Sequence, residues 1–344
     1  MPLVTIKDIA REAGVGMTSV SRALNGQPGL SEATRARILA VAEELQFTPN
    51  PHARNLKVKT NRKVVIAVVK GPTNPMFQVL VDQLAEALRE RGFMLETARA
   101  SNAEDEYEVA RRVMRNDKPA GLVLLGGVID PLPADLERLR VPFVLCTTPE
   151  LDVIEPATYS SVRVDEQQSV RLQVEALIDR GHRRIAYIGM PPGEHSSGAV
   201  RLRAFIDVMT EHGLDCGPDL QLFAEADQDS YYTFGYGHAL TGELIDGGTD
   251  VTAICAASDT IALGAHKAIL ERGLRIPEDF SVVGFAGIEQ SSWVHPELAT
   301  VRQPLDRFVE ATCDVLLGQI EDGRPRQHVV FPGELLVRDS LGSR

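Results

Sequence analysis

The sequence has no apolar run long enough to cross a membrane and no export signal at its start. No uninterrupted apolar stretch in the 344 residues approaches the roughly 20 residues that a membrane-spanning helix needs. The N-terminal residues also lack the apolar segment of a secretory signal peptide. We therefore expect a cytoplasmic protein that has no membrane partner.

Cysteine is scarce and follows no metal-binding or redox pattern. The chain has only four cysteines, which are widely separated and never occur as a Cys-x-x-Cys pair. They are Cys146, Cys216, Cys255 and Cys313. We expect all four to be reduced core residues, as is usual in a cytosolic protein.

The motifs of common catalytic and cofactor sites are also missing. After the first expected strand the chain reads Lys70-Gly71-Pro72-Thr73-Asn74 instead of a Gly-x-Gly-x-x-Gly turn. It contains no phosphate-binding P-loop, no His-Glu-x-x-His and no Gly-x-Ser-x-Gly nucleophile elbow. The histidines show no metal-ligand spacing, and several lie near expected turns or helix ends. We therefore expect no catalytic residue, no metal ion and no cofactor, and we predict that the protein is not an enzyme.

Charge is distributed unevenly along the chain. The whole protein carries −12 at pH 7, which by itself argues against binding to nucleic acid. Residues 1–63, however, contain ten Lys or Arg and five acids, a net charge of +5 that leaves −17 for the other 281 residues. A small basic segment on a large acidic body attracts phosphate to that segment and repels it elsewhere.

Two short helices are predicted inside the basic segment, from Val4 to Gly26. Thr5 and Asp8 have the spacing of a capping box, which begins a first helix, and Gly14 suits the left-handed turn that ends it. A second helix is predicted to begin near Met17. Two helices joined by a glycine-containing turn form a helix-turn-helix, whose second helix enters the DNA major groove. An ordinary helical hairpin inside an enzyme has the same spacing, so the pattern alone leaves both interpretations open.

The order of residues in this stretch is typical of one family. The segments T-I-K-D-I-A, A-G-V and V-S-R-A-L-N-G closely resemble the DNA-binding headpiece of lactose-repressor-type (LacI/GalR) transcription regulators. The resemblance assigns residues 1–47 to this headpiece, with a third helix that opens at Ser31. On the second helix, Met17 and Thr18 suit thymine methyl groups and Arg22 suits guanine. The expected DNA-binding residues of the headpiece are Thr5, Met17, Thr18, Ser21, Arg22, Asn25, Ser31 and Thr34.

The next segment, residues 48–63, contains a short expected helix. Asn50 is a good N-cap and Pro51 a good first helical residue, but so short a segment with few apolar residues would be unstable alone. A plain basic linker is the alternative interpretation. Four residues resemble the hinge helix of the same family, and the resemblance implies that its leucine wedges into the minor groove. They are Asn50, Ala53, Arg54 and Leu56.

From Lys63 onward, expected strands alternate with expected helices. The apolar run 64–69 is typical of a strand buried on both faces, and repeated strand–helix units predict doubly wound parallel sheets. Two such units predict two lobes, with a ligand at the carboxyl ends of the strands. This part resembles the effector domain of the same family. The expected fold class is therefore an N-terminal all-α helix-turn-helix headpiece plus an α/β two-lobed body of the type I periplasmic-binding-protein fold.

In that fold the chain crosses between the lobes three times. We place the crossings near Val164, Leu298 and Gln327. The expected N-terminal lobe comprises residues 64–163 with about 299–327, and the expected C-terminal lobe comprises residues 164–298 with about 328–340. No leucine heptads follow Val337, so a homodimer is expected instead of a tetramer.

The resemblance also places an effector site in the body. Its expected residues are Phe77, Asp165, Arg201, Tyr231, Ser258 and Ala286. Phe77 is equally consistent with a core position, and Asp259 beside Ser258 with a helix cap. Relatives usually carry two aspartates where this chain has Ala286 and Gly287. With this acidic counterpart missing, Arg201 is expected to be an unopposed cation, which favours an anionic effector such as a sugar acid or sugar phosphate.

These features predict a sequence-specific DNA-binding transcription regulator, most simply a repressor. It is expected to bind a pseudo-palindromic operator as a homodimer and to respond to a small, carbohydrate-derived effector between its lobes. One alternative is a regulator with a degenerate pocket that senses a protein partner. Another is a solute-binding protein that does not bind DNA, against which the basic headpiece and the missing signal peptide argue.

Overall fold

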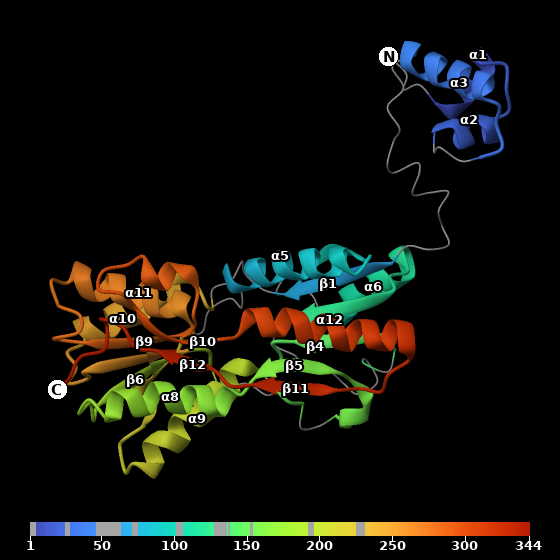
Figure 1. Cartoon of the computed structure of the whole chain (residues 1–344). Helices are drawn as coiled ribbons and strands as arrows, with labels where there is room; N and C mark the ends of the chain where they lie inside the picture. The colour runs from blue at the N-terminus through green and yellow to red at the C-terminus, as the bar shows by residue number, and fades with distance from the viewer. Residues whose placement is uncertain are drawn as a thin grey trace. The chain divides into compact units, whose positions relative to one another are not determined.

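The protein is described by a computed structural model that covers residues 5–24, 28–45, 63–70, 75–100, 106–126, 136, 138–151, 154–191, 196–224 and 231–344. The chain divides into two compact units, Met1–Arg62 and Lys63–Arg344, which we call the head and the body. Figure 1 shows the helical head and the sheet-containing body. Each unit is described by itself.

The head contains helices α1 (Ile6–Glu12), α2 (Met17–Leu24) and α3 (Glu32–Glu44). The Asp8 carboxylate accepts hydrogen bonds from the backbone N–H and the hydroxyl of Thr5, at 3.0 and 2.6 Å, which fixes the start of α1. Gly14 ends this helix in the left-handed region, with φ +64°. There the N–H groups of Gly14 and Val15 donate to carbonyls of the last turn, as in a Schellman motif.

One apolar core holds the three helices of the head together. Ile9 from α1, Val20 from α2 and Ile38 from α3 are fully buried and belong to a single cluster. The polar face of α2 is thereby fixed toward solvent, because its apolar face is committed to this core. The predicted helix start near Met17 agrees with the structure, and α1 begins directly after Thr5 of the predicted capping box.

The described strands of the body form two six-stranded sheets. The first has the order β11-β5-β4-β3-β1-β2 and is parallel throughout. Its strands are β1 (Val64–Lys70), β2 (Met94–Ala100), β3 (Gly121–Leu125), β4 (Phe143–Cys146), β5 (Ser161–Val164) and β11 (His328–Phe331). Both faces of β1 are buried, since alternate residues enter two separate apolar clusters.

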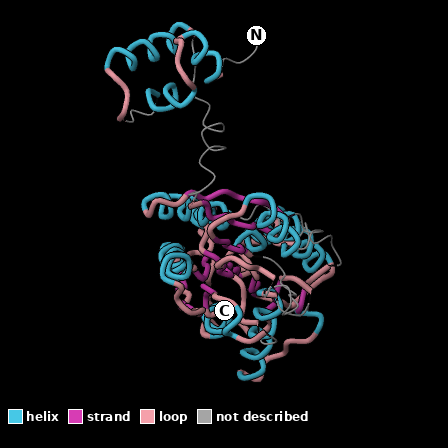
Figure 2. The backbone as a smooth tube through the Cα atoms, turned by 90° about the vertical axis from the view of Figure 1, so that its right-hand side faces the viewer, coloured by secondary structure: helices cyan, strands magenta, loops and turns pink. Residues whose placement is uncertain are grey.

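The second sheet has the order β12-β10-β9-β8-β6-β7, and β12 at its edge is antiparallel to β10. Its strands are β6 (Ile185–Ile188), β7 (Gln221–Leu222), β8 (Ala253–Ala256), β9 (Ser281–Ala286), β10 (Ala299–Arg302) and β12 (Glu334–Leu336). The two sheets define a first and a second lobe of the body. Figure 2 shows the strands lying inside a layer of helices.

Helices cover both sheets. Those of the first lobe are α5 (Pro75–Glu90), α6 (Glu106–Asp117) and α12 (Leu305–Asp322), and those of the second are α8 (Glu166–Ile178), α9 (Ser197–Glu211), α10 (Phe234–Asp246) and α11 (Asp259–Glu271). Short 3₁₀ turns are η1 (Pro156–Thr158), η2 (Pro218–Leu220) and η4 (Glu289–Ser292). Among the described residues, no helix is long and apolar enough to span a membrane.

Two of the expected crossings between lobes are wrong by one strand each. Strand β10 pairs with β9 and therefore belongs to the second sheet, although residues 299–302 were expected in the first lobe. Strand β11 pairs with β5 in the first sheet, although residues 328–331 were expected in the second lobe. The crossings thus follow Val164, Arg302 and Phe331. A four-residue apolar strand does not encode its partner locally, so the sequence pattern could not assign these strands to a sheet.

Candidate nucleic-acid interface and effector site

The solvent-facing side of α2 combines an apolar and a basic group. Met17 at the helix start is 45% exposed, and Thr18 and Arg22 are also exposed. The eight residues of α2 include no acid. Val20 and Ala23 on the opposite side are buried in the head core. This exposed side therefore has the composition of a surface that reads base edges, namely apolar groups for methyls and a guanidinium for guanine.

Other head residues expected at DNA have structural roles as well. Ser31 is the N-cap of α3, where its hydroxyl accepts from the Thr34 N–H at 3.2 Å and lies 2.8 Å from the Thr34 hydroxyl. The Thr5 hydroxyl donates to Asp8, as described above. Their exposed hydroxyls keep further hydrogen-bonding capacity toward a phosphate. The expected contacts Asn25, Asn50, Ala53, Arg54 and Leu56 lie outside the described residues.

In the body, Arg201 of α9 is not an unopposed cation, contrary to expectation. Its Nε and Nη2 donate to the two carboxylate oxygens of Glu166 at 2.7 and 3.0 Å, and its Nη1 donates to the Ala257 carbonyl at 2.6 Å. The guanidinium also lies 3.8 Å from the centre of the Phe285 ring. Burial alone would lower the pKa of Arg201, but the Glu166 carboxylate raises it above its ordinary value, so Arg201 stays protonated.

Two tyrosines lie within electrostatic reach of this ion pair. Burial raises the pKa of Tyr187 and of Tyr232 above the ordinary value of 10.0, although Arg201 acts in the opposite direction. Both phenols are therefore neutral. The buried Tyr187 hydroxyl has no hydrogen-bond partner among the described residues. A Cβ added to Gly198 of α9 would lie 3.0 Å from the Tyr232 hydroxyl, which places that hydroxyl against the helix that carries Arg201.

The structure distinguishes Tyr232 from its neighbour Tyr231, which was the expected site residue. The Tyr231 hydroxyl donates to the Ala224 carbonyl at 3.4 Å, and its ring packs edge-on against Tyr236 at 5.4 Å. Tyr232 instead has φ +60°, and its carbonyl accepts from the Thr260 hydroxyl. The left-handed conformation of Tyr232 separates the directions of two adjacent rings, which the sequence pattern could not anticipate.

Ser258 and Asp259 organise the start of α11. Ser258 is the N-cap, and its hydroxyl accepts from the Ile261 N–H at 3.2 Å. Asp259 is not the cap, since its carboxylate accepts from the Thr300 hydroxyl at 2.6 Å and from the Ile288 N–H at 2.7 Å. Asp259 thereby fastens the loop after β9 to strand β10, while burial raises its pKa to about 6.

The end of β9 has no room for a side chain at Gly287. Ala286 has φ +119° and Gly287 has φ +73°, both outside the usual range of L-residues. A Cβ at Gly287 would lie 2.8 Å from the Cα and the Cβ of Arg302. Gly287 is therefore required by a close approach of two backbone segments.

The carboxyl ends of the first sheet carry an aromatic ring and two hydroxyls. A Cβ at Gly126, which follows β3, would lie 2.4 Å from the ring of Phe77, so this ring rests on the glycine. Thr147 and Thr148 follow β4, and their buried hydroxyls have no partner among the described residues. Thr147 also has φ +65°, a strained conformation for a β-branched residue.

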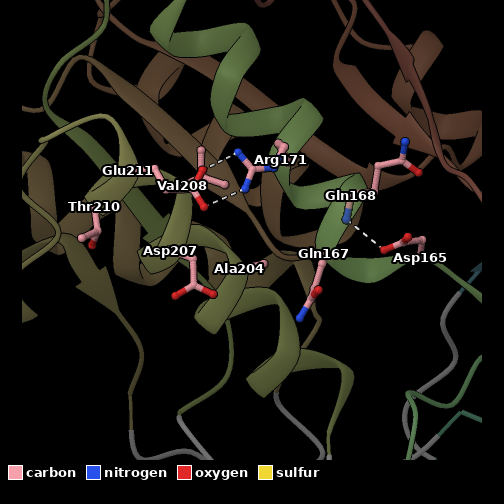
Figure 3. Close-up of a pocket in the computed structure, with 9 residues that line it drawn as sticks. All are labelled: Asp165, Gln167, Gln168, Arg171, Ala204, Asp207, Val208, Thr210 and Glu211. Carbon is pink, nitrogen blue, oxygen red and sulfur yellow. Dashed lines mark hydrogen bonds and ion pairs between the residues drawn. The ribbon is translucent and has the colours of Figure 1, made fainter.

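Asp165 directly precedes Glu166 but lines a cavity that Arg201 does not line. It is the N-cap of α8, where its carboxylate accepts from the Gln168 N–H at 2.9 Å. It lines a surface cavity of about 560 Å³ between α8 and α9, in which Arg171 is paired with Glu211 (Figure 3). Neither Arg201 nor Ser258 nor Ala286 lines this cavity.

Glu166, Tyr187 and Tyr232 were not among the residues expected at the effector site. The one available signal was Glu166 itself, because it is a carboxylate next to an expected lobe crossing. Its partner Arg201 is 35 positions away, and only the packing of α8 on α9 brings the two together.

Comparison with known proteins agrees with this organisation. The family model "Bacterial regulatory proteins, lacI family" matches residues 5–50, and the model "Periplasmic binding protein-like domain" matches residues 174–341. The regulator MalR of Clostridium butyricum is 31% identical over 98% of this chain and 99% of its own, and GalR of Escherichia coli is 30% identical over 99% and 96%. A solved CelR–cellobiose complex is 28% identical, covers 98% of this chain and 99% of its own, and superposes with a TM-score of 0.71. With a head that matches the DNA-binding model and full-length relatives that regulate transcription, this chain belongs to the lacI family of bacterial regulatory proteins and is a DNA-binding transcriptional regulator.

Proposed function

We propose that the protein is a repressor whose head reads operator DNA through the exposed side of α2. The observation that carries this proposal is the acid-free surface of Met17, Thr18 and Arg22, held outward by the buried Val20 and Ala23. Met17 and Thr18 contact thymine methyl groups, and Arg22 donates to guanine. The expected phosphate contacts are Ser21, Asn25, Ser31 and Thr34, with Thr5 beside them at the start of α1.

The proposed operator is a pseudo-palindrome bound by a homodimer. One short recognition helix reads only a few base pairs, so two heads related by a two-fold axis are needed for a specific site. Residues Asn50, Ala53, Arg54 and Leu56 would contact the minor groove at its centre, with Leu56 inserted between base pairs. A helix that forms only on DNA would link the state of the body to affinity, because ordering each residue costs about 1–2 kcal/mol.

The proposed effector is a carbohydrate-derived small molecule bound at the carboxyl ends of the strands. Those ends carry Arg201 with Glu166 in the second lobe and Phe77 in the first. A crevice at this position is the usual ligand site of doubly wound folds, and the similar CelR structure is a complex with cellobiose. Ser258 and Ala286 border this region, and Asp165 and Tyr231 support its loops. We propose ligand sensing without catalysis, in the cytoplasm.

Selection of DNA from a random pool by the full-length protein tests the regulator proposal. The expected result is enrichment of a two-fold symmetric sequence, with an affinity that falls as salt increases. Adding carbohydrates one at a time to the selected complex should then identify at least one that changes the affinity. A protein that enriches no sequence but still binds a carbohydrate would instead be a solute-binding protein, and the repressor proposal would fail.

A further inference from the structure

Arg201 and Glu166 form a bidentate ion pair inside the second lobe. The two nitrogen–oxygen distances are 2.7 and 3.0 Å, and the side chains are 10% and 6% exposed. The Ala257 carbonyl accepts from Nη1, and the ring of Phe285 covers one face of the guanidinium. The pair is therefore buried, has no net charge and is held by three different elements.

We propose that Glu166 determines the charge of the effector that this site accepts. Paired with Arg201, it selects an uncharged polyhydroxylated ligand and disfavours a carboxylated or phosphorylated one. This inference rests on the effector site proposed above. It replaces the expected anionic effector, because that expectation required Arg201 to have no acidic partner.

An anion is disfavoured because Glu166 already occupies the cation. A ligand carboxylate or phosphate that bound Arg201 would approach the Glu166 carboxylate or displace it. Approach brings two negative charges together in a poorly solvated place, and displacement leaves a buried carboxylate without its cation. Both outcomes cost more than the ligand would gain from a guanidinium whose charge is already balanced.

Hydroxyl groups meet complementary partners at the same place. Each terminal nitrogen of a guanidinium carries two N–H groups, so Nη1 and Nη2 of Arg201 each keep one that no described residue accepts. The carboxylate oxygens of Glu166 keep further lone pairs. The Tyr187 hydroxyl is buried without a described partner, and a ligand hydroxyl, which both donates and accepts, is complementary to each of these three groups.

The other polar groups near the pair add no cation. Tyr187 and Tyr232 are neutral phenols, and the Asp259 carboxylate is occupied by Thr300 and Ile288. At the carboxyl ends of the first sheet the unpartnered groups are the hydroxyls of Thr147 and Thr148, which are also neutral. The groups named here thus offer hydroxyl partners and add no cation to the site.

The test compares inorganic phosphate and a matched ligand set on the full-length protein. Glucose, glucuronate and glucose 6-phosphate share a ring and differ in the charged group. Calorimetry at constant ionic strength measures the dissociation constant of each ligand. Glu166→Gln keeps the side-chain size and removes the charge. It should lower the dissociation constants for phosphate and glucose 6-phosphate by about tenfold or more, because it leaves a buried cation unpaired. Glu166→Gln combined with Arg201→Gln should abolish this gain.

Glu175→Gln is the matched control, since Glu175 lies on the same helix but is partly exposed and paired with Arg171. It should bind each anion as the wild-type protein does. Equal phosphate binding by the wild type and Glu166→Gln would overturn the proposal. If Glu166→Gln does not fold, the wild type decides alone, because tighter binding of glucuronate or glucose 6-phosphate than of glucose would also overturn it. Failure to select an operator is a separate result, which contradicts the proposed regulator and leaves this comparison intact.

Discussion

The hydroxyl of Thr300 donates a 2.6 Å hydrogen bond to the carboxylate of Asp259, which ties strand β10 to the first turn of α11. The second carboxylate oxygen accepts from the N–H of Ile288, in the loop that follows β9. Asp259 is 1% exposed, and the described residues that hydrogen-bond to it include no cation. A buried carboxylate in this position joins three segments at the edge of the proposed effector site and has a pH-dependent charge.

The charge of Asp259 should make stability depend on pH. Burial raises its pKa from 3.8 to about 6 in the folded protein, although Thr300 and Ile288 lower it. The folded state therefore binds this proton more tightly than the unfolded chain does. The stabilisation that Asp259 contributes is therefore complete below pH 3.8 and is lost as the pH rises through about 6. As the pH falls from about 7 to about 5, protonation of Asp259 should raise the free energy of unfolding by about 1 kcal/mol.

Urea denaturation of Asp259→Asn measures this contribution. The variant cannot titrate, so the change in its unfolding free energy between the two pH values should differ from that of the wild type by this amount. Asp246→Asn is the control, since the exposed Asp246 is paired with Arg272, which lowers its pKa below 3.8 and outside this interval. An identical pH dependence of Asp259→Asn and wild type would show that Asp259 is ionised throughout.

Tyr187→Phe should stabilise the free protein and weaken effector binding. The Tyr187 hydroxyl is buried and has no partner among the described residues, so its removal relieves a desolvation cost of about 1 kcal/mol or more. Tyr236→Phe is the matched control, because the Tyr236 hydroxyl donates to the Gly189 carbonyl at 2.9 Å and accepts from the Ala224 N–H at 3.1 Å. It should lose stability by about the same amount. Thermal unfolding in the absence of ligand distinguishes the two, and destabilisation by Tyr187→Phe would mean that the hydroxyl is already satisfied.

The local features of the head were predictable because neighbouring residues determine them. The capping of α1 by Thr5 and Asp8, and the left-handed turn at Gly14, need only contacts within a few positions. The alternation of strands and helices in the body was likewise encoded in local apolar patterns. Strands β10 and β11 were assigned to the wrong sheets because their partners are distant in sequence.

The charge balance of the proposed effector site could not be predicted from the sequence. Whether Arg201 is opposed depends on Glu166 in another helix, and nothing in the spacing of the two residues indicates their contact. The choice between Tyr231 and Tyr232 depends on one backbone angle, φ +60° at Tyr232. The sequence shows Ala286 where an aspartate was expected. It does not show that the Glu166 carboxylate already balances the charge of Arg201.

Arg22→Ala should relax the base preference of the operator at one position in each half-site. A bidentate contact from arginine to guanine contributes about 1–3 kcal/mol of discrimination, which the variant loses only at the base pair that Arg22 contacts. Arg37→Ala removes the same charge from an exposed site on α3. It should lower the affinity for every operator sequence by about the same factor, and by less than Arg22→Ala lowers the affinity for the preferred operator. Fluorescence anisotropy with single-substituted operators provides the comparison. Uniform weakening by Arg22→Ala would indicate a phosphate contact.

Leu56→Ser tests whether the hinge segment bends the operator. An apolar side chain inserted between base pairs unstacks them and kinks the duplex, and a small polar side chain does not compensate for the lost stacking. The variant should lose most of the bend and much of its specific affinity. Effector affinity, measured by calorimetry, should be unchanged because the effector site proposed for the body uses no hinge residue. Circular-permutation gel shifts measure the bend directly, and a wild-type bend in Leu56→Ser would exclude Leu56 as the inserted residue.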